Sequence, residues 1–331
     1  MVHFLQQKRW HVVPELSRRR LLKAIGAVVL AGALTGCAGM DFRNKIVDPE
    51  LYSKKDSEID LAKAAAENTN RMVLEKFANS LRVVDDPWGF KTVEMFIQEN
   101  GSDSLIIAEN SDGPLLRAAS LAVAQHVPML IFDDSMRSQV SHTIDSLGAT
   151  RVVLIGDVEV ATTSGDVEIF QDPGTTRAMG EMTAFQFTSR VVGKPEQMVE
   201  AISHLNGTDY VELKSAWEPV ERIEGLEVLP IPAQSRRDSE MSPFVIATPE
   251  TSVAAVTNSM VFGAQVRVMP TPDPRDSKAQ MAQVAGLADG PLIALGAQFG
   301  DEELLSDRIK DGWDDKLSSP RKLHPTDNSD S

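Results

Sequence analysis

Cysteine is nearly missing from this sequence, which has one, Cys37, among 331 residues. One thiol cannot form an intramolecular disulfide, and it cannot supply the several thiolates of a cysteine-ligated metal site. Long apolar runs are missing as well. The apolar stretch at residues 24–34 is too short to cross a hydrocarbon core of about 30 Å as a permanent helical anchor.

Aromatic residues and positive charge are also scarce. Aromatics make up 5% of the chain, which disfavours an aromatic-lined sugar platform. Residues 1–36 hold six of the 33 Lys and Arg residues but one of the 48 Asp and Glu residues, so their removal changes the formal net charge from −15 to −20. A surface this acidic repels polyphosphate, and we therefore predict no nucleic-acid partner.

Motifs that carry known chemistry are missing too. No G-x-G-x-x-G or G-x-x-x-x-G-K-[ST] loop follows an apolar run, and no H-E-x-x-H or G-x-S-x-G motif occurs. Beyond residue 36 the histidines are His126, His142, His204 and His324, and their spacing favours surface or packing roles over catalysis. We predict no catalytic residue, no metal site and no cofactor.

The N-terminal region has the three parts of an export signal. The basic stretch Ser17–Lys23, which contains Arg18 and Arg19, resembles the twin-arginine motif, with leucine in place of the usual phenylalanine. The apolar stretch follows, and small residues come after it. This order predicts a signal peptide over residues 1–36 and leaves both the twin-arginine and the general secretory route open.

The only cysteine directly follows that apolar stretch. Leu34-Thr35-Gly36-Cys37 resembles a bacterial lipobox, which implies that the Cys37 thiol receives a diacylglyceryl group, with palmitate-type acyl chains, and becomes the first mature residue. Two acyl chains anchor a protein stably, because each buried CH₂ contributes about 0.8 kcal/mol. We therefore expect a lipoprotein on the outer face of the cell membrane of a Gram-positive bacterium, with actinobacteria among the candidate sources.

The rest of the chain shows an α/β pattern. Apolar runs at 104–108, 128–132 and 151–155 predict strands, and amphipathic stretches at 114–126 and 135–147 predict the helices between them. The same order returns in strands at 243–247, 264–269 and 291–295. Short strands that alternate with helices predict repeated, open βαβ units with parallel sheets.

The two sets of strands indicate an internal duplication. A shift of 139 residues places Ile107-Ala108 on Ile246-Ala247, and it also aligns Ser120 with Ser259, Val127 with Val266 and Asp134 with Asp273. A further slip of one residue aligns Gly156 with Gly296. Order, spacing and identities agree, so we predict two related units.

Less regular segments surround these units. Apolar residues recur at helical spacing within 57–84, which predicts one N-terminal amphipathic helix packed on the domain. The middle segment suggests strands at 166–170, 209–213 and 226–230, with helices at 176–192 and 195–204. We divide the chain into a signal peptide (1–36), a tether (37–55), a first unit (56–162), a middle segment (163–240), a second unit (241–311) and a disordered tail (312–331).

The first unit carries a recognisable order of motifs. They are Ala118-Ala119-Ser120-Leu121-Ala122, Pro128-Met129-Leu130-Ile131-Phe132-Asp133, Leu147-Gly148 and Val152-Val153-Leu154-Ile155-Gly156. This order resembles the type 2 cell-wall-binding repeat of Gram-positive surface proteins. The 108–114 loop is shorter than in that family, and Asp157 replaces its second glycine. The resemblance implies an open, Toprim-like α/β fold that binds wall polymers without catalysis.

Two loops are candidates for ligand contact, because open parallel sheets bind ligands at the carboxyl ends of their strands. One contains Asn110, Ser111 and Asp112, and the other contains Thr248, Glu250 and Thr251. In both loops, helix caps and turns are the favoured interpretation over ligand contact. Asp133-Asp134 could form a carboxylate pair for Mg²⁺, but Asp134-Ser135 as the N-cap region of the following helix is the favoured interpretation.

The sequence therefore leads to a non-enzymatic, lipid-anchored protein whose repeated units bind a cell-envelope polymer or an envelope protein. A solute-binding lipoprotein of a transporter is the alternative, since that class also joins two α/β lobes to a lipid anchor. A hinge between two lobes would favour the alternative, and units packed side by side would count against it. A divergent enzyme ranks lowest, and a structural subunit of a membrane complex stays open.

Overall fold

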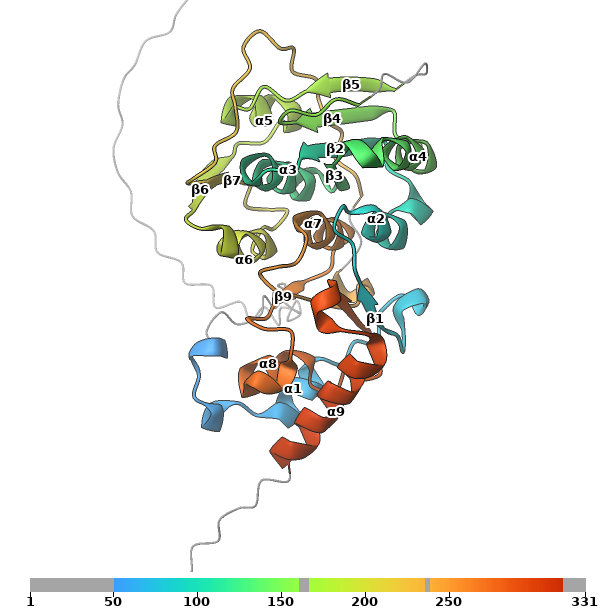
Figure 1. The fold of residues 1–331 in the computed structure, drawn as a ribbon, viewed down its shortest axis with the longest axis vertical. Helices are drawn as coiled ribbons and strands as arrows, with labels where there is room; N and C mark the ends of the chain where they lie inside the picture. The colour runs from blue at the N-terminus through green and yellow to red at the C-terminus, as the bar shows by residue number, and fades with distance from the viewer. Residues whose placement is uncertain (1–50, 161–166, 236–238, 318–331) are drawn as a thin grey trace, which may run out of the picture. The chain divides into compact units, whose positions relative to one another are not determined.

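The computed structural model describes residues 51–160, 167–235 and 239–317. The predicted export motif with Arg18 and Arg19, and the predicted lipidation site Cys37, lie outside the described residues. The described chain contains two four-stranded sheets, one two-stranded sheet and nine α-helices (Figure 1). All strand pairs in these sheets are parallel. The predicted α/β fold with parallel sheets is confirmed.

The first sheet follows the predicted order of elements. It contains β2 (Ser104–Glu109), β3 (Met129–Phe132), β4 (Arg151–Ile155) and β5 (Glu168–Gln171), arranged β3-β2-β4-β5. Helix α3 (Asp112–Gln125) joins β2 to β3, and α4 (Arg137–Leu147) joins β3 to β4. Every residue from Ser104 to Ala108 is buried, as expected for a central strand covered on both faces.

The second sheet repeats this arrangement. It contains β1 (Leu81–Val84), β8 (Phe244–Ala247), β9 (Val266–Val268) and β10 (Leu292–Leu295), arranged β1-β10-β8-β9. Helix α7 (Val253–Phe262) joins β8 to β9, and α8 (Lys278–Val284) joins β9 to β10. In both sheets the first strand of the unit lies between the second and the third, and a fourth strand lies beyond the third. This shared order supports the duplication.

The structure corrects the alignment of the repeats in detail. Gly156 and Gly296 both follow the third strand of a unit and have positive φ, as the alignment predicts. The first helices end at left-handed caps at His126 and Gly263, which are 137 residues apart rather than 139. Val127 therefore does not correspond to Val266. The reason is that α7 begins 141 residues after α3 but has 10 residues where α3 has 14, so its end lies two residues earlier than the alignment predicts.

The long helix predicted over 57–84 is wrong beyond Glu67. Helix α1 spans Leu61–Glu67, and its C-cap residue Asn68 donates hydrogen bonds to the carbonyl oxygens of Ala282 (3.2 Å) and Ala285 (2.9 Å). The chain then forms a short 3₁₀ turn and β1, which pairs with β10. Pairing with β10 overrides the helical spacing of the apolar residues. As a result, residues assigned to the first unit complete the sheet of the second.

The middle segment forms a third, two-stranded sheet. It contains β6 (Thr188–Val192) and β7 (Val211–Ser215). Helix α5 (Thr176–Thr183) precedes β6, and helix α6 (Met198–Ser203) precedes β7. The helix predicted over 176–192 is therefore wrong after Thr183, because Ala184 adopts a left-handed conformation and β6 pairs with β7. The strand predicted at 226–230 is not formed. Leu226 is 36% exposed and joins no strand ladder of the described chain.

Secondary structure extends into both segments that were predicted to be flexible, the tether and the tail. Helix α9 spans Glu302–Leu317, so the tail does not begin at residue 312. Trp313 packs against the second hydrophobic cluster, which holds the helix in place. At the other end, the hydroxyl of Tyr52 donates to the carbonyl oxygen of Val268 (3.3 Å), which ties part of the predicted tether to β9. None of the described helices has the length and apolarity needed to span a bilayer.

Helices α3 and α7 join the two units. They pack against each other, and every residue of α7 and residues 113–125 of α3 are buried. In α7, the Asn258 side chain accepts a hydrogen bond from the backbone N–H of Met129 in β3 (2.8 Å) and donates one to its carbonyl oxygen (3.0 Å). One hydrophobic cluster contains residues of both sheets. The units thus share a core.

Candidate functional site

The predicted loop after β2 is covered by another part of the chain. The backbone N–H of Asp112 donates to Glu218 Oε2 (2.8 Å), and the indole N–H of Trp217 donates to Asp112 Oδ2 (2.8 Å). A Cβ on Gly113 would lie 2.3 Å from the carbonyl oxygen of Glu218, so the two backbones approach as closely as glycine allows. Asn110 remains exposed at the end of this loop.

The predicted loop after β8 is closed by a glutamine. The amide of Gln298 donates to the hydroxyl oxygens of Thr248 (2.8 Å) and Thr251 (3.0 Å). The Thr251 hydroxyl in turn donates to the carbonyl oxygen of Leu295 (2.9 Å). Thr248 is 2% exposed and Thr251 is 5% exposed, whereas Glu250 is exposed. Neither threonine can touch an external ligand in this arrangement.

The six residues predicted to contact a ligand therefore fall into different environments. Asn110 and Glu250 face solvent, while Ser111 and Asp112 are half-buried. The hydroxyls of the two threonines form hydrogen bonds that close their own loop. The structure places the two loops at the ends of different sheets and pairs each with a different segment. Ligand binding by these loops stays a prediction.

Of the pair Asp133-Asp134, Asp133 acts as a cap. Asp133 Oδ1 accepts a hydrogen bond from the backbone N–H of Ser135 (2.9 Å), and hydrogen bonds from Ser135 lower the pKa of the Asp133 carboxyl. Asp134 forms an ion pair with Arg137 at 2.7 Å. Capping is confirmed as the role of this region, but the cap is Asp133, which begins the 3₁₀ turn Asp134–Met136, and not the predicted Asp134-Ser135. Across the described ranges, no group of three or more His, Cys, Asp or Glu residues could hold a metal ion.

A buried ionic cluster, which sequence reasoning missed, lies between the first sheet and the third. Arg117 in α3 bonds Asp172 through Nε (2.5 Å) and Nη2 (2.8 Å), and Glu212 in β7 through Nη1 (2.5 Å). Its Nη2 also donates to the carbonyl oxygen of Thr175 (2.8 Å). The side chains of Arg117, Asp172 and Glu212 are 1%, 0% and 3% exposed. The signal was the single arginine in the apolar stretch 114–126.

Two further residues complete the cluster. The hydroxyl of Thr176, at the start of α5, donates to Glu212 Oε2 (2.5 Å). Lys214 Nζ lies 3.0 Å from the same oxygen and donates to the Thr176 hydroxyl (2.9 Å). Two cations thus balance two carboxylates, as burial of charge requires. The cluster fixes α5 and the third sheet to α3.

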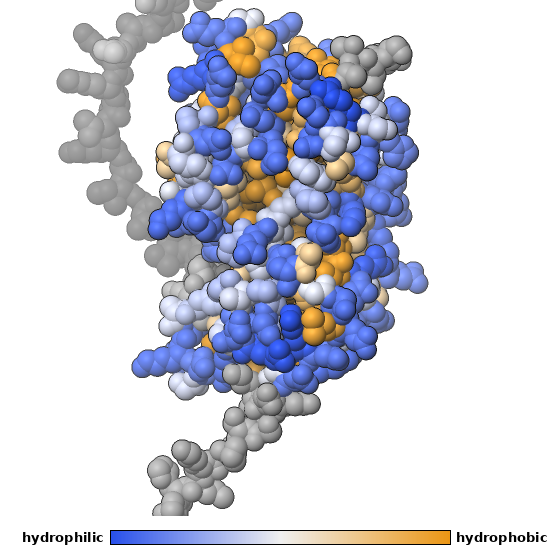
Figure 2. Space-filling view, in the orientation of Figure 1, coloured by the Kyte–Doolittle hydropathy of each residue, from blue (hydrophilic) through white to orange (hydrophobic). Residues whose placement is uncertain are grey.

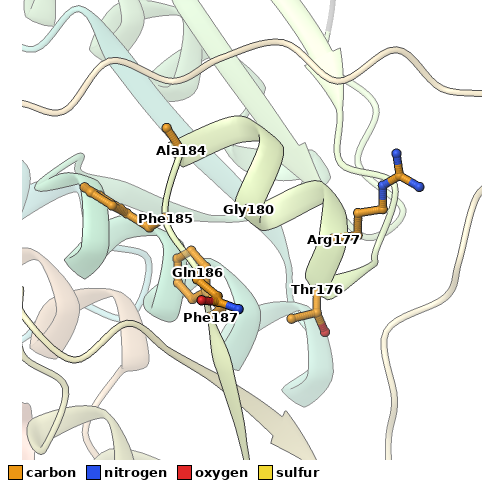
Figure 3. Close-up of a pocket in the computed structure, with 7 residues that line it drawn as sticks. All are labelled: Thr176, Arg177, Gly180, Ala184, Phe185, Gln186 and Phe187. Carbon is orange, nitrogen blue, oxygen red and sulfur yellow. The ribbon is translucent and has the colours of Figure 1, made fainter. Parts of the chain in front are cut away.

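A groove lies beside this cluster, between α5 and the start of β6 (Figure 3). Its volume is about 430 Å³, and its lining residues are Thr176, Arg177, Gly180, Ala184, Phe185, Gln186 and Phe187. Tyr210 stacks on Phe185 with ring centroids 3.8 Å apart and an interplanar angle of 9°. Sequence reasoning missed the groove because it assigned residues 176–192 to one helix. We call it the α5–β6 groove.

A second hollow of about 430 Å³ lies beside the edge strand β1. Its lining includes the cations Lys76, Arg82 and Lys91 and the acids Asp85, Glu94 and Glu302. Lys76 is paired with Glu99 at 2.9 Å, and Lys91 Nζ donates to the backbone oxygen of Asp85 (2.6 Å). Charges of both signs are mixed here, so this surface favours neither an anionic nor a cationic ligand.

Comparison with known proteins places this chain among distant structural neighbours. No family model matches the sequence, and no curated protein matches it either. Among solved structures, Cwp6 from Clostridium difficile is similar with 11% identity and a TM-score of 0.38, covering 69% of this chain and 48% of that one. Cwp8 from Clostridium difficile is similar with 12% identity and a TM-score of 0.41, covering 70% and 51%.

This chain thus spans about half the length of those two proteins. The TM-scores of both matches are below 0.5. A likeness of that size carries no argument about ligand, location or activity.

Proposed function

We propose that this protein is a lipid-anchored, extracytoplasmic binding protein that attaches to a cell-envelope polymer without catalysing a reaction. The order of basic stretch, apolar stretch and lipobox in residues 17–37 supports export and lipid anchoring at Cys37. The repeated parallel α/β units support the binding role, as in the family that the 118–160 motifs resemble.

One observation carries the choice between the two leading functions. A solute-binding lipoprotein holds its ligand in a cleft between two lobes that move about a hinge. Here helices α3 and α7 pack against each other with residues 113–125 of α3 and all of α7 buried, and Asn258 of α7 forms hydrogen bonds to β3 of the first unit. This arrangement favours a single rigid binding body over a hinged clamp.

The ionisable groups of the core are consistent with a binding role. Arg117, Asp172 and Glu212 use their charged atoms to hold one another. Catalytic acids and bases are instead usually directed into a cleft where a substrate can reach them. We therefore assign this cluster to structure, and we propose that ligand is bound at the surface.

The anchoring part of the proposal is tested by cell fractionation. The full-length chain and its Cys37→Ser variant are expressed in the same Gram-positive host and labelled with palmitate. We expect label and detergent-extractable membrane association for the wild type, and neither for the variant, because the serine hydroxyl replaces the acylated thiol. A wild-type chain that is unlabelled and freely released would contradict lipid anchoring.

The binding part is tested by co-sedimentation. Full-length chain, purified from membranes in mild detergent, is mixed with cell walls of the producing organism before and after acid extraction of their secondary polymers. We expect pelleting with intact walls and its loss after extraction. Failure to pellet with intact walls at physiological salt would overturn polymer binding, and pelleting that survives extraction would point to the remaining wall instead.

A further inference from the structure

We propose that the α5–β6 groove is a binding subsite for an acidic sugar segment of a glycan. This inference rests on the proposed function, because it names the surface and the ligand chemistry through which an envelope polymer would be bound. Three features of the groove carry it: aromatic side chains in its wall, the exposed amide of Gln186 and the guanidinium of Arg177 at its rim.

Aromatic side chains form one wall of the groove. Phe185 is half-buried, and Phe187 is 9% exposed. The ring of Tyr210 stacks on that of Phe185, and its centroid lies 5.9 Å from the ring centroid of Phe187. Three rings thus gather at one place in a chain that is 5% aromatic. Rigid aromatic surface beside solvent binds apolar faces at low conformational cost, and the C–H face of a pyranose is such a partner.

Polar groups line the rest of the groove. Figure 3 shows Gln186 beside Phe187, Thr176 at the start of α5, and Arg177 reaching outward from α5, away from the rings. Gln186 is exposed, so its amide can both donate to and accept from sugar hydroxyls. The Arg177 side chain is 88% exposed, and its Nε donates a hydrogen bond to Glu181 Oε1 (2.7 Å). The terminal amino groups of Arg177 are thus directed to solvent.

The charge of the groove differs from that of the whole chain. Of the residues that line the groove, Arg177 is the ionisable one, whereas the chain as a whole has a formal net charge of −15. Glu181 pairs with this guanidinium at 2.7 Å and raises the pKa of Arg177. A guanidinium at the rim favours a carboxylate or phosphate substituent on the sugar.

Backbone and small side chains keep the groove open. Gly180 lies in α5 opposite the carbonyl oxygen of Phe185, which a Cβ at Gly180 would approach to 3.1 Å. Ala184 turns the chain out of the helix with φ of +60°, so α5 ends before it could cover the rings. Thr176 is fixed by its bonds to Glu212 and Lys214. The subsite is therefore built on elements that the ionic cluster holds in place.

The test compares three variants of the full-length chain, Arg177→Ala, Gln186→Ala and Arg190→Ala, purified in mild detergent. Arg190 lies on β6, is exposed and does not line the groove, so Arg190→Ala is a charge-matched control. The probe is the secondary polymer released from walls by acid, titrated by calorimetry. We expect binding about tenfold weaker for Arg177→Ala and Gln186→Ala, because each loses hydrogen bonds to the ligand, and unchanged binding for Arg190→Ala.

Salt provides a second readout. Wild-type binding is expected to weaken between 50 and 500 mM NaCl, on the order of the range in which exposed charge pairs become screened, and Arg177→Ala is expected to lose most of that dependence. If the wild type binds the polymer and Arg177→Ala and Gln186→Ala bind it equally well, the groove is not the subsite although the proposed function stands. If the wild type does not bind the polymer at all, the proposed function fails first.

Discussion

At the scale of single residues, Arg117 has the strongest structural role. It is a fully buried cation that bonds two carboxylates and one backbone carbonyl. Burying a charge is unfavourable unless partners replace its lost water. The four charges of this cluster come from α3, the turn after β5 and strand β7, so their mutual bonds also determine how three segments meet.

We expect Arg117→Met to lower the free energy of unfolding by about 3–5 kcal/mol, because Asp172 would be left buried without its cation and Glu212 would keep Lys214 alone. Urea denaturation followed by circular dichroism measures the change. Arg190→Met serves as the control, since Arg190 is exposed, and its substitution should shift the midpoint little. Equal effects of the two substitutions would show that the cluster contributes no net stability.

At the residue scale, the sequence indicated one member of the buried ionic cluster. An arginine inside the apolar stretch 114–126 is visible in the sequence and marks a buried partner. Its acidic partners, 55 and 95 residues further along, could not be chosen among 48 acidic residues. Likewise, the sequence indicated Thr248 and Thr251 as ligand-contact or cap residues, and only the position of Gln298 shows that their hydroxyls are already bonded.

At the scale of elements, Asn258 attaches helix α7 to strand β3. This buried side chain bonds Met129 on both its N–H and its carbonyl, and it also donates to the carbonyl oxygen of Gly89 (3.2 Å). Met129 begins the edge strand β3, whose backbone groups need partners on the side away from β2. One asparagine therefore satisfies a strand of the first unit from a helix of the second.

We expect Asn258→Leu to lower the free energy of unfolding by about 2–4 kcal/mol, because the buried N–H and carbonyl of Met129 would lose their partner. Ser259→Ala is the matched control from the same helix. The Ser259 hydroxyl donates to Ala255 within α7 (2.9 Å), so its loss should cost less. Thermal unfolding of both variants measures the difference, and a ranking with Ser259→Ala as the less stable variant would contradict this role of Asn258.

Elements in the duplicated units were predictable, and so were the strands at 166–170 and 209–213 and the helix at 195–204 outside them, whereas 57–84 and 176–192 were assigned wrongly in part. Strands such as 104–108 and 151–155 are short, apolar after their first residue and bounded by turns, so local pattern and tertiary structure agree. In 57–84 and 176–192 the spacing of the apolar residues favours a helix. The structure has strands β1 and β6 there instead, because the edges of β10 and β7 offer backbone hydrogen-bond partners to these segments.

At the scale of the whole molecule, a polar surface encloses a shared core. The face in Figure 2 is mostly hydrophilic, with apolar residues showing between polar ones. One hydrophobic cluster runs through both sheets and through α3 and α7, and a second cluster lies on the other face of the second sheet. A continuous core between units favours joint folding over independent lobes.

We therefore expect a single unfolding transition for the described body. Calorimetric and van't Hoff enthalpies should agree, and tryptophan fluorescence should follow the same midpoint as circular dichroism, because neither unit can expose its side of α3 and α7 alone. Trp88 packs against the first cluster and Trp313 against the second, so fluorescence reports on both. Two resolved transitions would indicate separable lobes and would favour a hinged solute-binding protein.

The sequence by itself determined the α/β class, the parallel strands of both units and their duplication, because these depend on local periodicity that recurs along the chain. It also indicated export and lipidation at Cys37. The tertiary structure decided that an N-terminal strand completes the second sheet, that Gln298 and Trp217 cover the predicted loops, and that scarce aromatics gather at the α5–β6 groove. Each of these depends on contacts between residues far apart in the chain, and no local pattern encodes which distant partner a free strand edge, a buried charge or a ring will meet.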